Sequence, residues 1–132
     1  MINQLAMTAV IIAKNEELML PGCINSLRWC QDILLIDNGS TDKTVELAEQ
    51  LGARVIHFQH SSFAKLRNEA IKHVSTDWLI HLDADERVTP TLAKEIGVTI
   101  ETKKITALSM KRKNIFFGQE LKHGGWAMDQ VT

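Results

Sequence analysis

The sequence predicts an α/β protein with a doubly wound, mainly parallel sheet flanked by helices. Three observations predict it: continuous β-branched apolar runs, apolar residues at helical spacing between them, and polar turns where the runs end. Strands that alternate with helices favour a parallel sheet with right-handed crossovers. With 132 residues, of which 45% are hydrophobic, the chain suffices for one domain, which we expect to span residues 1–132.

Two strand–helix units are expected in the first part of the chain. Residues 7–13 form a continuous apolar run, typical of a strand covered on both faces, and residues 20–29 have helical spacing. Residues 32–37 predict a second strand. The helix after it is expected to begin at an N-cap, Thr41, and to reach about Leu51.

The same alternation continues after Gly52, which is expected to end that helix. Strands are predicted at residues 53–58 and 77–82, with a helix at 63–74 between them. A further helix is expected at residues 90–100, a strand at 105–117 and an irregular tail at 118–132.

Composition narrows the class of protein. Fifteen Lys and Arg against sixteen Asp and Glu give a formal net charge of -1, which offers no support for nucleic-acid binding. Cys23 and Cys30 lack the spacing of a disulfide framework or a zinc site, so free, buried thiols and a cytoplasmic location are expected. No segment approaches the roughly 20 apolar residues of a membrane span.

Acidic residues gather after the strand at 77–82. Asp83, Asp85 and Glu86 follow it directly, at the edge where open α/β sheets place their ligands. Asp83 and Asp85 can share Mg²⁺ or Mn²⁺, completed by water and diphosphate oxygens. The alternative is a solvated approach to the next helix, with the charges favouring its dipole.

Asp37 ends the second predicted strand before a turn that contains glycine. A carboxylate at this place can accept hydrogen bonds from a ribose hydroxyl or a base edge, or it can simply cap its own turn. The segment from Ala13 to Glu16 contains no glycine, so the dinucleotide fingerprint is absent and a nicotinamide enzyme is disfavoured.

Basic and aromatic side chains complete the candidates. Lys65 and Arg67 stand near the start of the helix at 63–74, where a guanidinium suits a diphosphate; a solvated helix face is the alternative. His123 and Trp126 flank two glycines and can form a sugar platform, unless the loop is merely packed by its tryptophan. Four other histidines are scattered singly and are expected to be structural.

Together these residues resemble the inverting family 2 glycosyltransferases of GT-A fold. The resemblance lies in VIIAKNEE (10–17), IDNGSTDKT (36–44), LRNEA (66–70) and WLIHLDADE (78–86). The strings KNIFFG (113–118) and HGGW (123–126) are similar to the branch that adds sugars to the lipopolysaccharide core.

The resemblance implies a nucleotide-sugar site. Its nucleotide-binding residues would be Ala13, Lys14, Asn15, Glu16, Asp37, Lys65, Arg67 and Asp83; its metal ligands would be Asp83 and Asp85, and its acceptor or sugar loop would hold His123 and Trp126. The donor implied is a nucleotide-diphospho-sugar, with UDP as the favoured nucleotide, and the acceptor is a saccharide or glycolipid of the cell envelope. Peripheral membrane association at the inner face of the cytoplasmic membrane and a homo-oligomer are compatible with it.

The implied reaction is a single displacement at the anomeric carbon, in which a carboxylate base deprotonates the acceptor hydroxyl. Members of the family carry that base beyond the metal motif, and Asp129 is the only carboxylate late enough to substitute for it, so the chain is expected to be an N-terminal donor-binding part. The alternative is a non-catalytic nucleotide-sugar-binding module. A nucleotidyltransferase is disfavoured, since it would normally need a Gly- and Arg-rich phosphate loop after the first strand.

Overall fold

The computed structural model describes residues 4–102, 107–108, 110–111, 115–116, 119–120 and 130–131. The chain divides into two compact units, Met1–Gly97 and Val98–Thr132, and each is described by itself. The expectation of one domain over residues 1–132 stays a prediction. The elements are β1 (Leu5–Ala13), α1 (Leu20–Asn25), β2 (Cys30–Asp37), α2 (Thr44–Gln50), β3 (Arg54–His57), α3 (Phe63–Ile71), β4 (Trp78–Asp83), α4 (Pro90–Thr102), β5 (Met110–Lys111), β6 (Ile115–Phe116), β7 (Gln119–Glu120) and β8 (Gln130–Val131).

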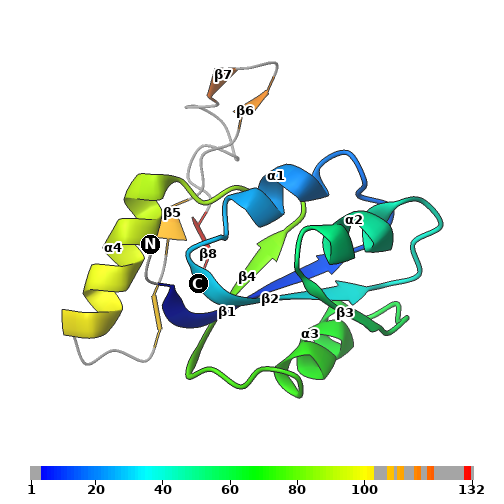
Figure 1. The fold of residues 1–132 in the computed structure, drawn as a ribbon, viewed down its shortest axis with the longest axis horizontal. Coiled ribbons are helices and arrows are strands. Elements are labelled where there is room, and N and C mark those ends of the chain that lie inside the picture. The colour runs from blue at the N-terminus through cyan, green and yellow to red at the C-terminus, as the bar shows by residue number, and fades with distance from the viewer. Residues whose placement is uncertain are drawn as a thin grey trace. The chain divides into compact units, whose positions relative to one another are not determined.

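Four parallel strands form the sheet of the first unit, in the order β3-β2-β1-β4. Helices α1 and α2 lie on one face of the sheet and α3 lies on the other (Figure 1). Helices on both faces are the mark of a doubly wound sheet, so the fold class predicted from the sequence is confirmed.

The two central strands, β1 and β2, are apolar along most of their length, which allows helices to cover both of their faces. Side chains at alternate positions of a strand point to opposite faces. On the α3 face, β1 and β2 pack against α3 in one buried cluster, composed of Val10, Leu34, Ile36, Leu66 and Ala70. Ile11 and Leu35, at the positions between, are fully buried toward the other face. This core holds the carboxyl ends of β1 and β2 in fixed register.

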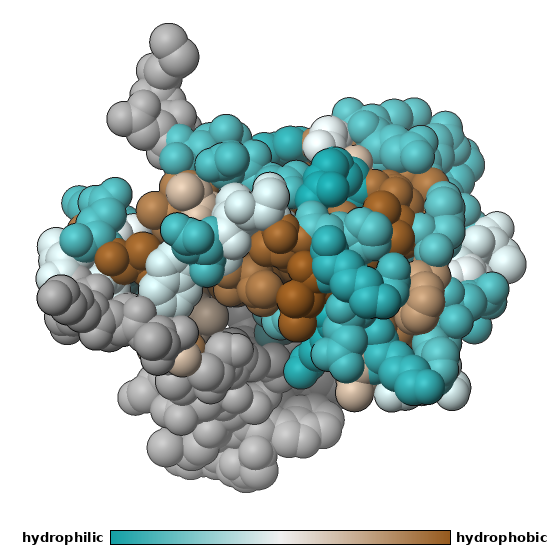
Figure 2. Space-filling model, turned by 90° about the horizontal axis from the view of Figure 1, so that it is seen from below, coloured by the Kyte–Doolittle hydropathy of each residue, from teal (hydrophilic) through white to brown (hydrophobic). Residues whose placement is uncertain are grey.

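Figure 2 looks onto the side of the sheet on which α3 lies. Much of that surface is hydrophilic, with hydrophobic side chains showing in the middle of the view. Helix α3 itself buries Leu66 and Ala70 and exposes Lys65 and Arg67. Among the described residues, no helix combines the length and the apolar character needed to cross a bilayer.

Two helices end earlier than the sequence predicts. The helix expected at 20–29 ends at Asn25, because the Ser26 hydroxyl donates to the Cys23 carbonyl at 2.7 Å and competes with further helical turns. The helix expected at 63–74 ends at Ile71. The N–H groups of the next three residues, Lys72 to Val74, donate to carbonyls three positions back, which tightens the chain into turns.

The strand predicted at residues 105–117 is not one strand in the part of the chain that the structure describes. Two short strands stand there, β5 and β6. Strand β6 pairs antiparallel with β7, so the chain reverses direction between Phe116 and Gln119, and β5 pairs antiparallel with β8. The tail expected to be irregular thus contributes strands to both pairs.

Both cysteines are free and buried, as expected. Burial raises the pKa of Cys23 and of Cys30 to about 12. At neutral pH both are therefore protonated, inert thiols, since the thiolate is the reactive form.

Candidate functional site

Three neighbouring strands carry residues singled out from the sequence at their carboxyl ends. Ala13 ends β1 and is paired in register with Asp37, which ends β2; Asp83 ends β4 and is paired with Ile12. The strand order reverses between β1 and β4, the place where open α/β sheets form a ligand crevice. Asp37 and Asp83 thus flank β1, about 10 Å apart at two strand spacings.

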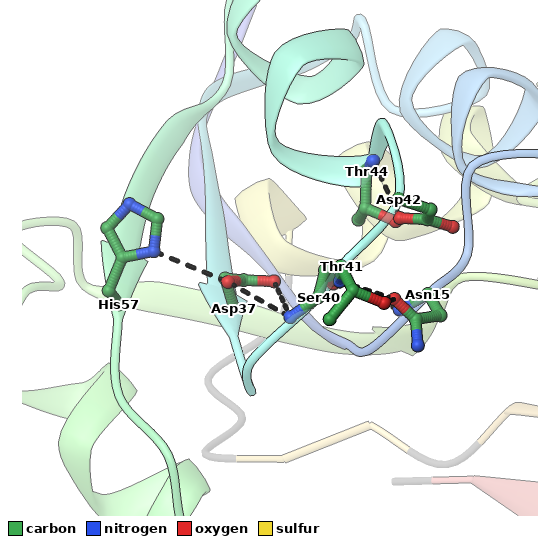
Figure 3. A network of polar contacts seen from close by, with 7 residues as sticks. All are labelled: Asn15, Asp37, Ser40, Thr41, Asp42, Thr44 and His57. Atoms are coloured by element: carbon green, nitrogen blue, oxygen red, sulfur yellow. Dashed lines mark hydrogen bonds and ion pairs between the residues drawn. The ribbon is translucent and has the colours of Figure 1, made fainter.

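The β1–α1 loop (residues 14–19) folds against the β2–α2 loop (residues 38–43). The Asn15 N–H donates to the Ser40 hydroxyl at 2.9 Å, and the Asn15 side-chain oxygen accepts the Thr41 N–H at 2.7 Å (Figure 3). Asn15 has a φ of 54°, a left-handed conformation that asparagine adopts more readily than most residues. Its amide oxygen therefore binds the neighbouring loop, and its predicted contact with a nucleotide stays a prediction.

The same two loops are joined again one turn further on. The Glu16 N–H donates to the Thr44 hydroxyl at 2.8 Å. Glu17 and Asp42 face each other: the Glu17 N–H donates to the Asp42 carboxylate at 3.3 Å, and the Lys43 N–H donates to the Glu17 carboxylate at 3.1 Å. The backbone after β1 is thereby held beside the first turn of α2.

Thr41 does not cap α2, so that prediction is wrong. The helix begins at Thr44, and the residue that binds its first N–H is Asp42, whose carboxylate accepts from the Thr44 N–H at 2.9 Å and from the Thr44 hydroxyl at 2.5 Å. Thr41 donates to Asn15 instead. Desolvation acts to raise the pKa of Asp42, but the hydrogen bonds from Thr44 and Glu17 outweigh it and lower the pKa.

The lowered pKa of Asp42 predicts acid sensitivity. A carboxylate whose folded-state pKa lies below its unfolded value of about 3.9 stabilises the fold above that value and loses its contribution as pH falls through the folded pKa. We expect the free energy of unfolding, measured in urea, to be level above about pH 5 and to fall below about pH 4. Asp42→Asn should flatten this slope, and an unchanged slope would contradict the assignment.

Asp37 is 4% exposed and lies between two partners. Its carboxylate accepts the Ser40 N–H at 3.2 Å, and the Nδ1 atom of His57 lies 3.3 Å from its other oxygen (Figure 3). Asp37 therefore does cap its own turn, as one of the two interpretations of the sequence predicted. A carboxylate has about four acceptor positions, so capacity for a nucleoside hydroxyl or base edge remains.

The acidic residues after β4 form a closed turn. The Glu86 N–H donates to the Asp83 carbonyl at 2.9 Å, and the Asp83 N–H donates to the Glu86 carboxylate at 2.8 Å. Glu86 thus has a structural role in the turn. Asp83 and Asp85 are exposed, and within the described residues neither carboxylate receives a hydrogen bond. Two solvent-facing carboxylates remain for a ligand.

The basic candidates lie on α3. The Ser62 hydroxyl accepts the Lys65 N–H at 3.4 Å and caps this helix, and both Lys65 and Arg67 are exposed. Burial, with the charge of Arg67 added, lowers the pKa of His81 on β4. Arg67 is thus near enough to β4 for its charge to reach His81, whereas among the described residues Lys65 makes no side-chain hydrogen bond or ion pair. Lys14, in the β1–α1 loop, is exposed.

Three predicted residues, His123, Trp126 and Asp129, lie outside the described residues. Their assignments as acceptor loop and catalytic base stay predictions.

Asp83 and Asp85 suit a hard cation for which substrate and water provide most of the ligands. Within the described residues, no group of three or more His, Cys, Asp or Glu side chains could enclose a metal ion. Mg²⁺ uses one or two carboxylates together with water and substrate phosphates. Asp83 and Asp85 meet that requirement, so this donor set fits the ion implied by the resemblance.

Sequence reasoning missed two residues at this edge. His57 was expected to be merely structural, yet it contacts the carboxylate of Asp37. Arg87 was not singled out, although it hydrogen bonds to both the acidic turn and the segment before α1. Its position next to the acidic cluster was the available signal.

The sheet and the polar carboxyl ends of its strands place the chain in the class of doubly wound α/β proteins, which bind their ligands at the strand-order reversal. The chain belongs to glycosyl transferase family 2, whose sequence model matches residues 8–124.

Curated relatives agree with this family. The chain is 35% identical over 97 residues to the lipopolysaccharide core biosynthesis glycosyltransferase LpsC of Rhizobium meliloti, covering 70% of this chain and 36% of that protein. It is 38% identical over 90 residues to an uncharacterized glycosyltransferase of Rickettsia felis, covering 67% of this chain. The chain spans about a third of the length of these relatives (32% and 36%).

Solved structures share the fold. The TarS protein of S. aureus superposes with a TM-score of 0.64 at 20% identity, over 72% of this chain and 32% of that one. Glucosyl-3-phosphoglycerate synthase of Mycobacterium tuberculosis, solved with Mn²⁺, UDP and glucosyl-3-phosphoglycerate, superposes with a TM-score of 0.56 at 22% identity, over 61% of this chain and 35% of that one. At these identities the likeness establishes the GT-A fold alone.

Proposed function

We propose that this chain is the donor-binding part of an inverting glycosyltransferase that holds a nucleotide-diphospho-sugar, a UDP-sugar, at the carboxyl edge of its sheet. The observation that carries the proposal is that the buried carboxylate of Asp37 and the exposed Asp83 stand at the carboxyl ends of the two strands flanking β1, offset by one residue, with the exposed Asp85 two residues further on. This spacing suits a ligand with a nucleoside at one end and a diphosphate at the other.

Each residue has a role in this proposal. Asp37 accepts hydrogen bonds from the nucleoside. Residues 13–16, at the end of β1, contact the nucleotide as well. Arg67 and Lys65 neutralise diphosphate oxygens. Asp83 and Asp85 hold Mg²⁺ or Mn²⁺, which when bound supplies compensation for the charge that develops on the leaving diphosphate. Crystals of glucosyl-3-phosphoglycerate synthase contain Mn²⁺ with UDP, which supports this choice of ligands.

The acceptor is a saccharide or glycolipid of the cell envelope. The relative named for lipopolysaccharide core biosynthesis supports that class. His123 and Trp126 would contact the acceptor or sugar, and Asp129 would remove the proton from its hydroxyl. The free, buried cysteines support a reducing, cytoplasmic location, at the inner face of the membrane where a glycolipid acceptor would be met.

Calorimetry tests the donor assignment directly. UDP, GDP and ADP are titrated into the 132-residue chain in Mn²⁺ and in EDTA. We expect UDP to bind most tightly and Mn²⁺ to increase its affinity roughly 10-fold or more, since Asp83 and Asp85 would hold the cation and its charge would offset that of the diphosphate. No binding of any nucleotide in Mn²⁺ would overturn the proposal.

A second measurement separates transfer from binding. Hydrolysis or transfer of a UDP-sugar that Asp129→Ala abolishes would assign the base. Binding without turnover, unchanged by Asp129→Ala, would instead identify a nucleotide-sugar-binding module.

A further inference from the structure

The guanidinium of Arg87 bridges two separate segments of the chain. Its Nη1 atom donates to the Ala84 carbonyl at 2.9 Å and to the Glu86 carbonyl at 2.8 Å, both in the acidic turn. Its Nη2 atom donates to the carbonyl of Met19 at 2.6 Å, 68 residues away in sequence. One side chain therefore joins the turn that carries Asp85 to the residue just before α1.

Gly22, in the first turn of α1, makes room for this bridge. A Cβ atom at Gly22 would lie 2.6 Å from the Nε atom of Arg87 and 2.7 Å from its Nη2 atom. Real Cβ atoms do not approach other heavy atoms so closely, so any larger residue at position 22 must displace the guanidinium. The guanidinium is the far end of a flexible side chain and can move while the backbone stays in place.

Other contacts tie α1 to the same turn. The Cys23 thiol donates to the Asp83 carbonyl at 3.6 Å, and the Val88 N–H donates to the Ser26 hydroxyl at 3.1 Å. Helix α1 is joined in turn to the β1–α1 loop, since the Leu20 N–H donates to the Glu16 carbonyl at 2.9 Å. The acidic turn and the loop after β1 are thus both hydrogen bonded to α1 or to the residue that follows it.

We propose that Arg87 is a positioning residue for the metal and diphosphate site, and that Gly22 permits it to act. Resting on the proposed function above, this inference adds that the carboxylates of Asp83 and Asp85 are held in advance at the spacing a cation and a diphosphate require. A turn that must be ordered during binding loses affinity through the entropy of ordering. Arg87 touches neither nucleotide nor cation in this role.

Four variants separate positioning from charge. Arg87→Met removes the bridge, whereas Gly22→Ala displaces it and leaves every charge in the protein unchanged. Arg87→Lys keeps the charge but lacks the fork that reaches three carbonyls. Gly97→Ala is the matched control, because a Cβ there meets nothing within 4 Å. The gain in helix propensity from exchanging glycine for alanine is the same at both positions, so the two variants differ in the displacement of Arg87.

We expect Arg87→Met, Arg87→Lys and Gly22→Ala to weaken UDP binding in Mn²⁺ by roughly 10-fold, the lower end of what partners outside the ligand shell contribute at metal sites. In EDTA the affinity for UDP should stay at the wild-type level, and Gly97→Ala should match wild type in both buffers. A role through charge alone would leave Gly22→Ala and Arg87→Lys unaffected.

Hydrogen exchange without nucleotide gives a second readout. The Glu86 and Val88 amides should exchange faster in Arg87→Met and Gly22→Ala than in wild type, while the amides of β2 keep their rates. If wild type binds UDP with Mn²⁺ and these variants bind it equally well, the inference is wrong and the proposed function stands. If wild type binds no nucleotide in Mn²⁺, both are overturned.

Discussion

Replacing Asp85 by alanine should remove the gain in UDP affinity that Mn²⁺ provides. The acidic turn offers two exposed carboxylates, and loss of one leaves the cation a single protein ligand. Partners outside the ligand shell of a metal already contribute roughly 10–100-fold to affinity, so loss of a ligand should cost at least that much. Calorimetry with UDP in Mn²⁺ measures the effect, and affinity in EDTA should not change.

Asp77→Ala is the matched control for Asp85→Ala. Asp77 is an exposed carboxylate that precedes β4, so it lies at the amino end of the same strand. The substitution makes an equal change in net charge far from the proposed site, and UDP affinity should stay as in wild type. If Asp85→Ala binds UDP in Mn²⁺ as tightly as wild type does, the metal assignment fails.

Replacing Asp37 by alanine should weaken UDP binding whether or not Mn²⁺ is present. A hydrogen bond to a charged group contributes about 1.5–3 kcal/mol, which corresponds to roughly 10–150-fold in affinity. Asp37→Asn should have a smaller effect, because its amide keeps one oxygen that can accept the Ser40 N–H. Comparison of the two variants by calorimetry in EDTA separates the role of the charge from that of the turn.

Asp32→Asn serves as the control for Asp37. Asp32 lies near the amino end of β2 and pairs with Arg54 at 2.6 Å on the surface. Asparagine at this half-buried position keeps an oxygen that can accept from Arg54, so the sheet should remain intact and UDP affinity unchanged. Equal losses in Asp32→Asn and Asp37→Ala would point to damage to the strand rather than to a nucleoside contact.

The strands were the most predictable part of the fold. A run such as residues 7–13 is apolar at every position except Thr8, as two covering layers demand, so its own composition identifies it. The acidic residues were placed correctly for the same reason, since they follow directly where β4 ends. The helix ends were less predictable, because hydrogen bonds of single side chains, such as those of Ser26 and Asp42, decide them.

The partners of the loop residues could not be read from the sequence. Thr41 was expected to cap α2, but it donates instead to Asn15, which lies 26 residues earlier in the sequence. The reach of Arg87 to Met19 and its place against Gly22 are likewise set by how α1 packs beside the acidic turn. No local pattern encodes distances between segments so far apart.

The sequence by itself determined that the sheet is parallel and doubly wound and that carboxylates stand at the ends of two of its strands, because burial and periodicity are local properties. Only the tertiary structure decided that Asp37 and Asp83 flank the same strand, and that Glu86 and Arg87 support the acidic turn while Asp83 and Asp85 face solvent. Strand order and contacts across loops depend on packing between distant segments, which sequence spacing does not contain.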